Sequence, residues 1–455
     1  FLQGCSVQLR MSLSDTTRIQ ESVSISEDNI SNQDVQEGGL NIFKTSVFVS
    51  GVVAGAGVLA LPNAVKGSGD VGILLMFLAC LMSAYTGIIL GRTWLLILKR
   101  YPQYRETRAR YPYPLIGEIT FGKLGRHMVS FAINFSLFGA AVVYLVVSAG
   151  NIHSLVQELH GDIHACYWAL IVAGALAPFT LLNTPKDFWL LALGATATTA
   201  IACIILLANI IFDKSSHPTV KHTTPDFISF STAFGTMCFA FGGHPSFPTF
   251  QEDMREKKKF WKAVIVGYVL VVLMYVPVST TAYFVYGDDI KDNILHTVSK
   301  GPMNYTMTIL LTFHFLFGFI ILLNPVNQEL EHLFKVPDEF TWKRILSRTM
   351  LVAGIVFVAE TIPHFGLILS LIGGSTSTLL VFILPPLFYL KLCRMHPGLT
   401  ANGKSGELPL YTMVLNILIL VVGIAACVAS TYSGLHDVIS GKFTPPCYIS
   451  ITSAD

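Results

Sequence analysis

The chain has 455 residues, of which 52% are hydrophobic and 13% charged, and its formal net charge is +2. One water-soluble core cannot bury so many apolar side chains, so the composition predicts a protein embedded in a lipid bilayer. So small a net charge gives no basis for a nucleic-acid partner, and we expect none.

Residues 1–37 precede the first apolar run. They are rich in Ser, Gln, Asn and acidic residues and contain few large apolar side chains, so we expect a disordered cytoplasmic tail. They also lack the apolar core of a signal peptide. A membrane domain is then expected over residues 38–440, followed by a short extracellular or lumenal tail at 441–455.

Apolar runs of about 20 residues, the length that crosses ~30 Å of hydrocarbon, recur along the rest of the chain. Stretches such as GILLMFLACL (72–81) are apolar on every face, which favours helices over the alternating strands of a β-barrel. The sequence thus predicts an all-α integral membrane protein with eleven transmembrane helices. The predicted spans are 43–64, 71–98, 127–157, 166–182, 189–212, 227–246, 260–286, 304–333, 346–360, 364–390 and 410–433.

Lys and Arg gather in alternate links between these spans, chiefly at 99–126 and 251–262. Because cytoplasmic links carry the excess of positive charge, the N-terminus is predicted to be cytoplasmic and the C-terminus to lie on the other side.

Two spans contain residues that weaken helices. The first carries VSGVVAGAGVLALP (49–62), and the sixth carries FGGHPSFP (241–248). Glycine and proline at matching places in two halves are typical of the broken helices of secondary transporters. The starts of spans five and ten, LLALGATATT (190–199) and ILSLIGGSTST (368–378), also resemble each other at a similar spacing. These matches predict an inverted repeat of five plus five helices, with helices 1 and 6 broken.

An unwound segment in a membrane leaves backbone groups that need partners. In the first break, carbonyls around Ser50, Gly51 and Val52 suit an ammonium group or a cation. The N–H groups around Gly55, Ala56 and Gly57 suit a carboxylate. Together these groups predict a site for an α-amino acid. The alternative interpretation, a GxxxG surface on which two helices pack closely, is favoured for one such motif but less so when a second broken span exists.

The second break adds Gly242 and Gly243 to the predicted site, and Phe241 as a wall over an apolar substrate side chain. Tyr144 in span three is a candidate cavity residue, although a hydrogen bond between helices would explain it equally well.

Charged side chains are nearly absent at the middle of the membrane, which favours a small neutral substrate. His244 in the second break and His314 in span eight are the candidate proton carriers. A lone buried histidine more often bonds a neighbouring backbone group, so both interpretations stay open. The sequence suggests no metal site and no cofactor other than a coupling ion, H⁺ or Na⁺.

Two further features lie near the predicted outer face. Cys166 and Cys447 could form a disulfide, and Asn304 begins a glycosylation sequon.

These motifs resemble the amino acid/auxin permease family of the APC superfamily, whose fold is similar to that of the bacterial leucine transporter. GAGVLALP (55–62) matches the family pattern GxGxLxLP, and FAFGGH (239–244) matches its sixth-span pattern. YPLIGEITFG (113–122) and PPL (385–387) add to the similarity, which covers roughly residues 40–435.

The resemblance implies secondary active transport rather than an enzyme, with the substrate backbone held by the two breaks. It does not settle the ion. Sodium-coupled relatives tend to have asparagine where this chain has Gly51, and some proton-coupled animal relatives have histidine where it has Phe48. The sixth-span pattern favours protons.

We therefore expect a proton-coupled symporter of neutral amino acids, a monomer in the plasma membrane. A sodium-coupled transporter, a vesicular or lysosomal exporter and an amino-acid-sensing transceptor remain alternatives. A channel is disfavoured because no ring or repeat of polar pore residues is visible.

Overall fold

The computed structural model describes residues 39–106, 109, 111–159, 163–181, 188–217, 219–337, 339, 341–395, 408–440 and 446–450. Within these ranges the secondary structure is helical, apart from one isolated parallel bridge between Leu40 and Met254. The tail predicted over residues 1–37 lies outside the described residues, and so does the tail predicted over 441–455 except for 446–450.

The described residues form a succession of helices separated by turns and links of different lengths. The α-helices are α2 (Ile42–Val53), α3 (Gly57–Ser68), α4 (Gly72–Arg100), α5 (Gln103–Glu106), α6 (Pro112–Leu159), α7 (Ala165–Thr180), α8 (Phe188–Asp213), α9 (Phe227–Ala240), α10 (Phe247–Glu252), α11 (Phe260–Tyr286), α12 (Pro302–Leu333), α13 (Trp342–Thr361), α14 (Phe365–Ile372), α15 (Leu384–Met395), α16 (Leu410–Ile439) and α17 (Cys447–Ser450). The 3₁₀ turns are η1 (Gly69–Val71), η2 (Lys214–Ser216), η3 (His244–Ser246), η4 (Lys257–Lys259), η5 (Gly287–Asp289) and η6 (Ile294–His296), and the π-helical segments are η7 (Gly373–Ser377) and η8 (Leu379–Ile383).

Seven continuous helical stretches among the described residues are long and apolar enough to cross a membrane. They are Gly57–Arg100, Pro112–Gln157, Leu193–Ser216, Lys257–Asp289, Pro302–Leu333, Phe365–Met395 and Leu410–Ile439. Two shorter apolar helices, α2 and α7, accompany them. The chain is thus an all-helical membrane protein with multiple apolar spans. Helix α6 is longer than the span predicted there because it begins in the preceding link and bends at Gly122, whose φ of 69° suits glycine.

The helix interruptions fall in the two spans for which the sequence predicts them. Helix α2 ends at Val53 and α3 begins at Gly57, so residues 54–56 are unwound. Helix α9 ends at Ala240, and the chain passes through Gly242, Gly243 and the turn η3 before α10 begins.

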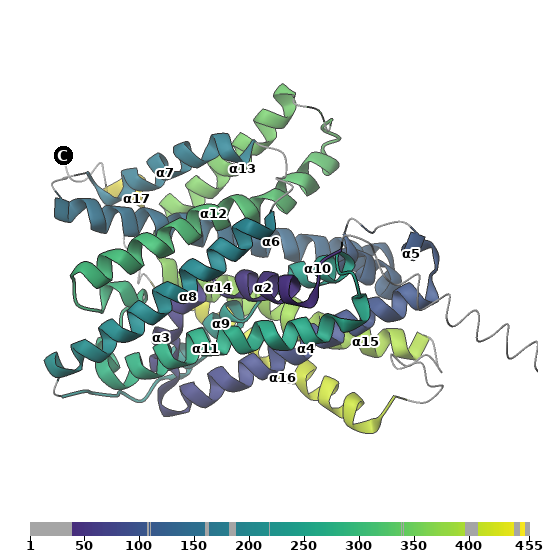
Figure 1. Ribbon diagram of the computed structural model, residues 1–455, viewed down its shortest axis with the longest axis horizontal. Helices are drawn as coiled ribbons and strands as arrows, with labels where there is room; N and C mark the ends of the chain where they lie inside the picture. Colours follow the sequence, from purple (N-terminus) through teal and green to yellow (C-terminus); the bar gives the residue numbers. More distant parts are fainter. Residues whose placement is uncertain are drawn as a thin grey trace, which may run out of the picture.

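The helices pack in two groups, which Figure 1 shows on opposite sides of the molecule. In one group α6 packs against α7, α12 and α13. In the other, α11 packs against α2, α3 and α4, and α3 packs against α9. Helices α8 and α14 contact both groups, since α8 meets α11 and α12 while α14 meets α6 and α9. The interrupted segments lie where the two groups meet.

Helix α11 connects the two ends of this bundle. We call the end with η5 and η6 the η6 end and the opposite end the α10 end. At the α10 end, Glu331 pairs with Arg348 (2.6 Å) and Arg344 (3.2 Å), and Arg348 also donates to the Thr180 carbonyl (2.6 Å). These buried contacts fasten α7, α12 and α13 together. At the η6 end, the Cys166–Cys447 disulfide, which the sequence left open, joins α7 to α17.

Candidate functional site

The first interruption leaves backbone groups of both polarities without partners. The Ala54 N–H still donates to the Ser50 carbonyl (2.6 Å), as in an α-helix, but the Gly55 N–H donates to the Val53 carbonyl (2.9 Å), only two residues earlier. Among the described residues nothing bonds the Gly51 and Val52 carbonyls, or the N–H groups of Ala56 and Gly57. Acceptors and donors therefore face one another across a gap of three residues, as expected of a zwitterion site.

Two tyrosines of α11 support both interruptions. Tyr275 donates to the Val53 carbonyl (2.9 Å), and Tyr268 donates to the Phe241 carbonyl (2.8 Å), which Ser83 of α4 also bonds (2.7 Å). The tyrosines are seven residues apart, about two helical turns, so they lie on one face of α11. They satisfy carbonyls that the breaks remove from the helical pattern. Sequence reasoning missed both, although a buried tyrosine hydroxyl in an apolar span needs a partner.

A cavity lies between the two interruptions and is closed by α6, α12 and the π-helical part of the α14–α15 span. Its lining contains six of the ten residues predicted for the substrate site: Val52, Gly55, Ala56, Tyr144, Gly242 and Gly243. The other lining residues are Val53, Ser136, Leu137, Ala140, Phe239, Pro245, Ser246, Leu322, Ser377, Leu380 and Val381. No charged side chain is among them. The polar side chains are three serines and Tyr144, and Ser136 Oγ lies 3.4 Å from Ser377 Oγ.

Tyr144 joins the cavity wall to the first interruption. A Cβ atom added to Gly55 would collide with the Tyr144 hydroxyl, so glycine leaves room for that hydroxyl at the unwound backbone. The ring is fixed from behind, because it packs against Phe315 with centroids 5.1 Å apart and against the backbone at Gly318. The hydroxyl is thus presented to the gap by a rigid support.

The remaining four predicted residues lie outside the cavity lining. The buried Ser50 hydroxyl donates to the Val47 carbonyl within its own helix (3.1 Å), and Gly51 contributes only its unpaired carbonyl to the gap. Gly57 faces α9, where an added Cβ would lie 2.7 Å from the Ala240 Cβ. The Phe241 ring is fully buried against Tyr275, with centroids 5.8 Å apart, rather than over the cavity.

The two candidate proton carriers are buried beside the cavity and do not line it. His244 stacks on Phe247 (centroids 4.9 Å apart), and its Nε2 lies 3.0 Å from Thr86 Oγ1. That hydroxyl donates to a backbone carbonyl of its own helix, so Nε2 carries the ring proton. Among the described residues Nδ1 has no partner.

His314 is held in the opposite tautomer. Its Nδ1 lies 3.0 Å from both the Ala195 carbonyl and Thr199 Oγ1 of α8. A carbonyl only accepts, so Nδ1 carries the proton and Nε2, for which the described residues offer no partner, has a free lone pair. The ring lies beside Tyr144, with centroids 6.1 Å apart. His314 is thus one side chain away from the cavity.

The predicted glycosylation residue is part of the packed η6 end. Asn304 is buried, its Nδ2 donates to the Leu295 carbonyl (3.1 Å), and its Oδ1 accepts from Thr308 (3.3 Å). The nitrogen that would carry a glycan is therefore engaged inside the protein, whereas glycans need a surface position.

Several known proteins are similar to this chain. Residues 38–435 match the model of the family described as transmembrane amino acid transporter protein. Amino acid transporter AVT1C of Arabidopsis thaliana is 26% identical over 399 residues, which cover 85% of this chain and 68% of that protein. Amino acid transporter AVT1J of the same plant is 25% identical over 421 residues, covering 90% of this chain and 93% of that protein.

Among solved structures, the crystal structure of MhsT in complex with L-phenylalanine matches 87% of this chain and 99% of MhsT with a TM-score of 0.51 at 12% identity. At that identity the match shows the fold, which is similar to that of the leucine transporter. The family match confirms the resemblance predicted from the sequence motifs and makes the protein a transporter, not an enzyme. The chain belongs to the transmembrane amino acid transporter family, also called the amino acid/auxin permease family.

Proposed function

We propose that this protein is a proton-coupled symporter of small neutral amino acids that works by alternating access. The observation that carries the proposal is the pair of unbonded backbone ends at residues 51–52 and 56–57, of which Val52 and Ala56 line the cavity. The N–H groups would bind the substrate carboxylate and the carbonyls its ammonium group. The Tyr144 hydroxyl would donate to the carboxylate as well.

The cavity lining supports a neutral substrate. A cationic or acidic side chain would enter an apolar site without a counter-charge, which is strongly unfavourable. Leu137, Phe239, Leu322 and Val381 would instead surround an apolar side chain, and the Ser136–Ser377 pair would bond a short polar one. MhsT, which has the same fold, was crystallised with an amino acid, L-phenylalanine.

We further propose eleven membrane spans in an inverted repeat of five plus five helices. The interrupted spans supply the first helix of each half, and Gly55 and Gly242 are 187 residues apart. The distribution of Lys and Arg supports a cytoplasmic α10 end and an outer η6 end, and we expect a monomer in the plasma membrane.

The polar contacts at the η6 end support a state closed to the outside. Asn63 of α3 donates to Asp292 (2.8 Å), and Lys66 of the same helix donates to the Ile290 carbonyl. On α6, the lining residue Ser136 lies nearer the α10 end than Tyr144 does. On α12, the lining residue Leu322 lies nearer the α10 end than His314 does. The cavity would therefore release substrate toward the α10 end.

For the coupling proton we favour His314 over His244. Both rings have a free nitrogen, but His314 is in ring contact with Tyr144, whereas His244 is stacked on Phe247 and bonded to α4. A proton on Nε2 of His314 would have no partner in the present state, so it would be accommodated only when α12 and α6 rearrange. Such a dependence couples proton binding to conformation.

The test is uptake of labelled amino acids into proteoliposomes that contain the purified protein. We expect an inward proton gradient to drive accumulation of small neutral amino acids and a protonophore to abolish it. Absence of gradient-driven uptake of every amino acid would refute the proposal.

Sodium coupling is the second candidate, because the free Gly51 and Val52 carbonyls would also suit a sodium ion. Uptake that follows a sodium gradient at constant pH and ignores the protonophore would favour sodium over protons.

A further inference from the structure

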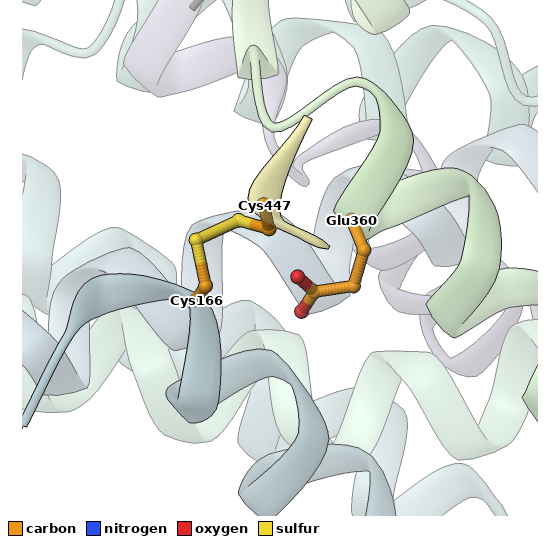
Figure 2. A group of neighbouring side chains, drawn as sticks. All are labelled: Cys166, Glu360 and Cys447. Carbon is orange, nitrogen blue, oxygen red and sulfur yellow. A yellow bond between two sulfur atoms is a disulfide. The ribbon is translucent and has the colours of Figure 1, made fainter. Parts of the chain in front are cut away.

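Three potential metal ligands meet at the η6 end, away from the cavity. Cys166 is the second residue of α7, Glu360 lies near the end of α13, and Cys447 begins α17. Their two sulfur atoms and a carboxylate oxygen all lie within 4.8 Å of one another. Figure 2 shows the Glu360 carboxylate directed toward the disulfide between the two cysteines. Three separate helices therefore contribute one ligand atom each.

One oxygen of the partly buried Glu360 carboxylate has no partner among the described residues in the disulfide-bonded state. This oxygen is Oε1, and it is itself buried. A carboxylate oxygen removed from water without a partner is unfavourable, and a neutral disulfide does nothing to offset that cost. In the reduced protein, a cation bound between the two thiolates and this oxygen would supply the missing partner.

We propose that reduction of the Cys166–Cys447 disulfide creates a site for Zn²⁺ with two thiolate ligands and the Glu360 carboxylate. In the first step a dithiol reductant transfers two electrons and two protons, so the protein gains two thiols and the reductant becomes a cyclic disulfide. In the second step Zn²⁺ binds, both thiols release their protons, and the complex has a net charge of −1. A water molecule completes the four ligands.

The ligand set and spacing suit zinc. Thiolates and carboxylates are both established zinc ligands, and tetrahedral coordination with Zn–S bonds of ~2.3 Å places two sulfur atoms about 3.8 Å apart. The observed spread of the three ligand atoms, at most 4.8 Å, is close to that requirement. Once the S–S bond is broken, rotation of the cysteine side chains would separate the two sulfur atoms to the distance that zinc requires. Hard cations such as Mg²⁺ prefer oxygen ligands and should bind poorly.

The proposal gives α17 two alternative links to the rest of the protein, one in the oxidised and one in the reduced state. In the oxidised protein the disulfide holds α17 to α7, and α17 also packs against α13. In the reduced protein the metal would hold all three elements through their ligands. Without either, α17 would lose its covalent link to α7 and keep its packing against α13.

The experiment uses the purified full-length protein in detergent, oxidised or reduced with a dithiol and then freed of reductant by gel filtration under nitrogen. Each sample is titrated with Co²⁺ and then with Zn²⁺. We expect the reduced protein alone to develop thiolate-to-cobalt charge-transfer absorption with one equivalent of Co²⁺, and Zn²⁺ to remove that absorption.

The matched variants are Glu360→Gln and the double variant Cys166→Ser/Cys447→Ser. The double variant retains the other six cysteines, at 5, 80, 203, 238, 393 and 427, so it measures their contribution. We expect Glu360→Gln to weaken Co²⁺ binding about tenfold or more, and the double variant to lose the absorption. If the double variant does not fold, the oxidised wild-type protein is the control without the two thiols.

Two results would overturn the proposal. One is reduced wild-type protein that binds no more Co²⁺ than the control. The other is a reduced Glu360→Gln protein that titrates like the wild type, because the carboxylate would then not be a ligand.

Discussion

The two glycines of the first interruption face different neighbours, so adding one methyl group to each should have different effects. A Cβ on Gly55 would overlap the Tyr144 hydroxyl, the end of a side chain that lines the cavity. A Cβ on Gly57 would lie 2.7 Å from the Ala240 Cβ, 2.9 Å from its Cα and 2.9 Å from the Tyr275 hydroxyl. We predict that Gly55→Ala impairs substrate binding and that Gly57→Ala impairs stability.

The magnitudes follow from these contacts. At Gly57 the obstacle includes backbone, and relief requires α3 and α9 to separate, so we expect a loss of about 1–3 kcal/mol in the free energy of unfolding. At Gly55 the Tyr144 hydroxyl is displaced and the methyl group shields the free N–H groups that follow. Loss of one hydrogen bond to a charged carboxylate, ~1.5–3 kcal/mol, would raise the half-saturation concentration about 10- to 150-fold.

The assay compares uptake at a series of substrate concentrations with thermal unfolding of the same purified variants. Gly150→Ala in α6 is the matched control, because a Cβ there meets no atom within 4 Å, and it should leave both properties unchanged. Gly55→Ala with wild-type half-saturation, or Gly57→Ala as stable as the wild type, would refute the assignment of these glycines.

Three further predictions concern other parts of the proposed mechanism. Tyr144→Phe keeps the packed ring and removes the hydroxyl, so the half-saturation concentration should rise about 10- to 150-fold in uptake assays while the melting temperature stays unchanged. His314→Gln should abolish accumulation driven by a proton gradient yet retain counterflow exchange of labelled substrate; equal loss of both would argue against a coupling role. Asp292→Ala removes the acceptor of the exposed Asn63 amide bond, worth about 0.5–1.5 kcal/mol, and should speed modification of an Ala140→Cys cavity label by an impermeant maleimide added at the η6 end. An unchanged labelling rate would refute the role of that contact in closing the η6 end.

The sequence predicts the interruptions well because glycine and proline act locally. Residues 54–56 and 241–246 leave the helical pattern where these residues cluster in otherwise apolar spans. It cannot separate the roles of Gly55 and Gly57, which read as the same motif. After the break the backbone direction changes, so one glycine faces the cavity and the other packs against Ala240. The two interpretations of the motif therefore each hold for one glycine: Gly55 belongs to an open site, and Gly57 belongs to a closely packed helix contact.

Other parts of the site depend on long-range contacts that no local pattern reveals. Ser377 reaches the cavity from a π-helical segment, in which backbone hydrogen bonds join residues five apart instead of four and side chains shift around the helix axis. Ser136 meets it from α6, 241 positions earlier in the chain. Periodicity based on an ideal α-helix does not place Ser377 correctly, and the similarity of GGSTST to span five pointed to the repeat and not to the site.

The tyrosines of α11 have a consequence for how the proposed carrier moves. Tyr275 bonds the first interruption at Val53 and Tyr268 bonds the second at Phe241, so both unwound segments are attached to one helix. Tyr144 approaches the same gap from α6, which packs with α7, α12 and α13 instead. If the two groups of helices rock against each other, the interruptions must move together with α11 while Tyr144 moves with α6. A substrate bonded to the unwound backbone and to Tyr144 would hold the two groups of helices together. When the groups separate, the substrate would lose the Tyr144 contact, while the backbone site itself stays unchanged. Release would then require breaking few bonds, because the two interruptions keep their geometry.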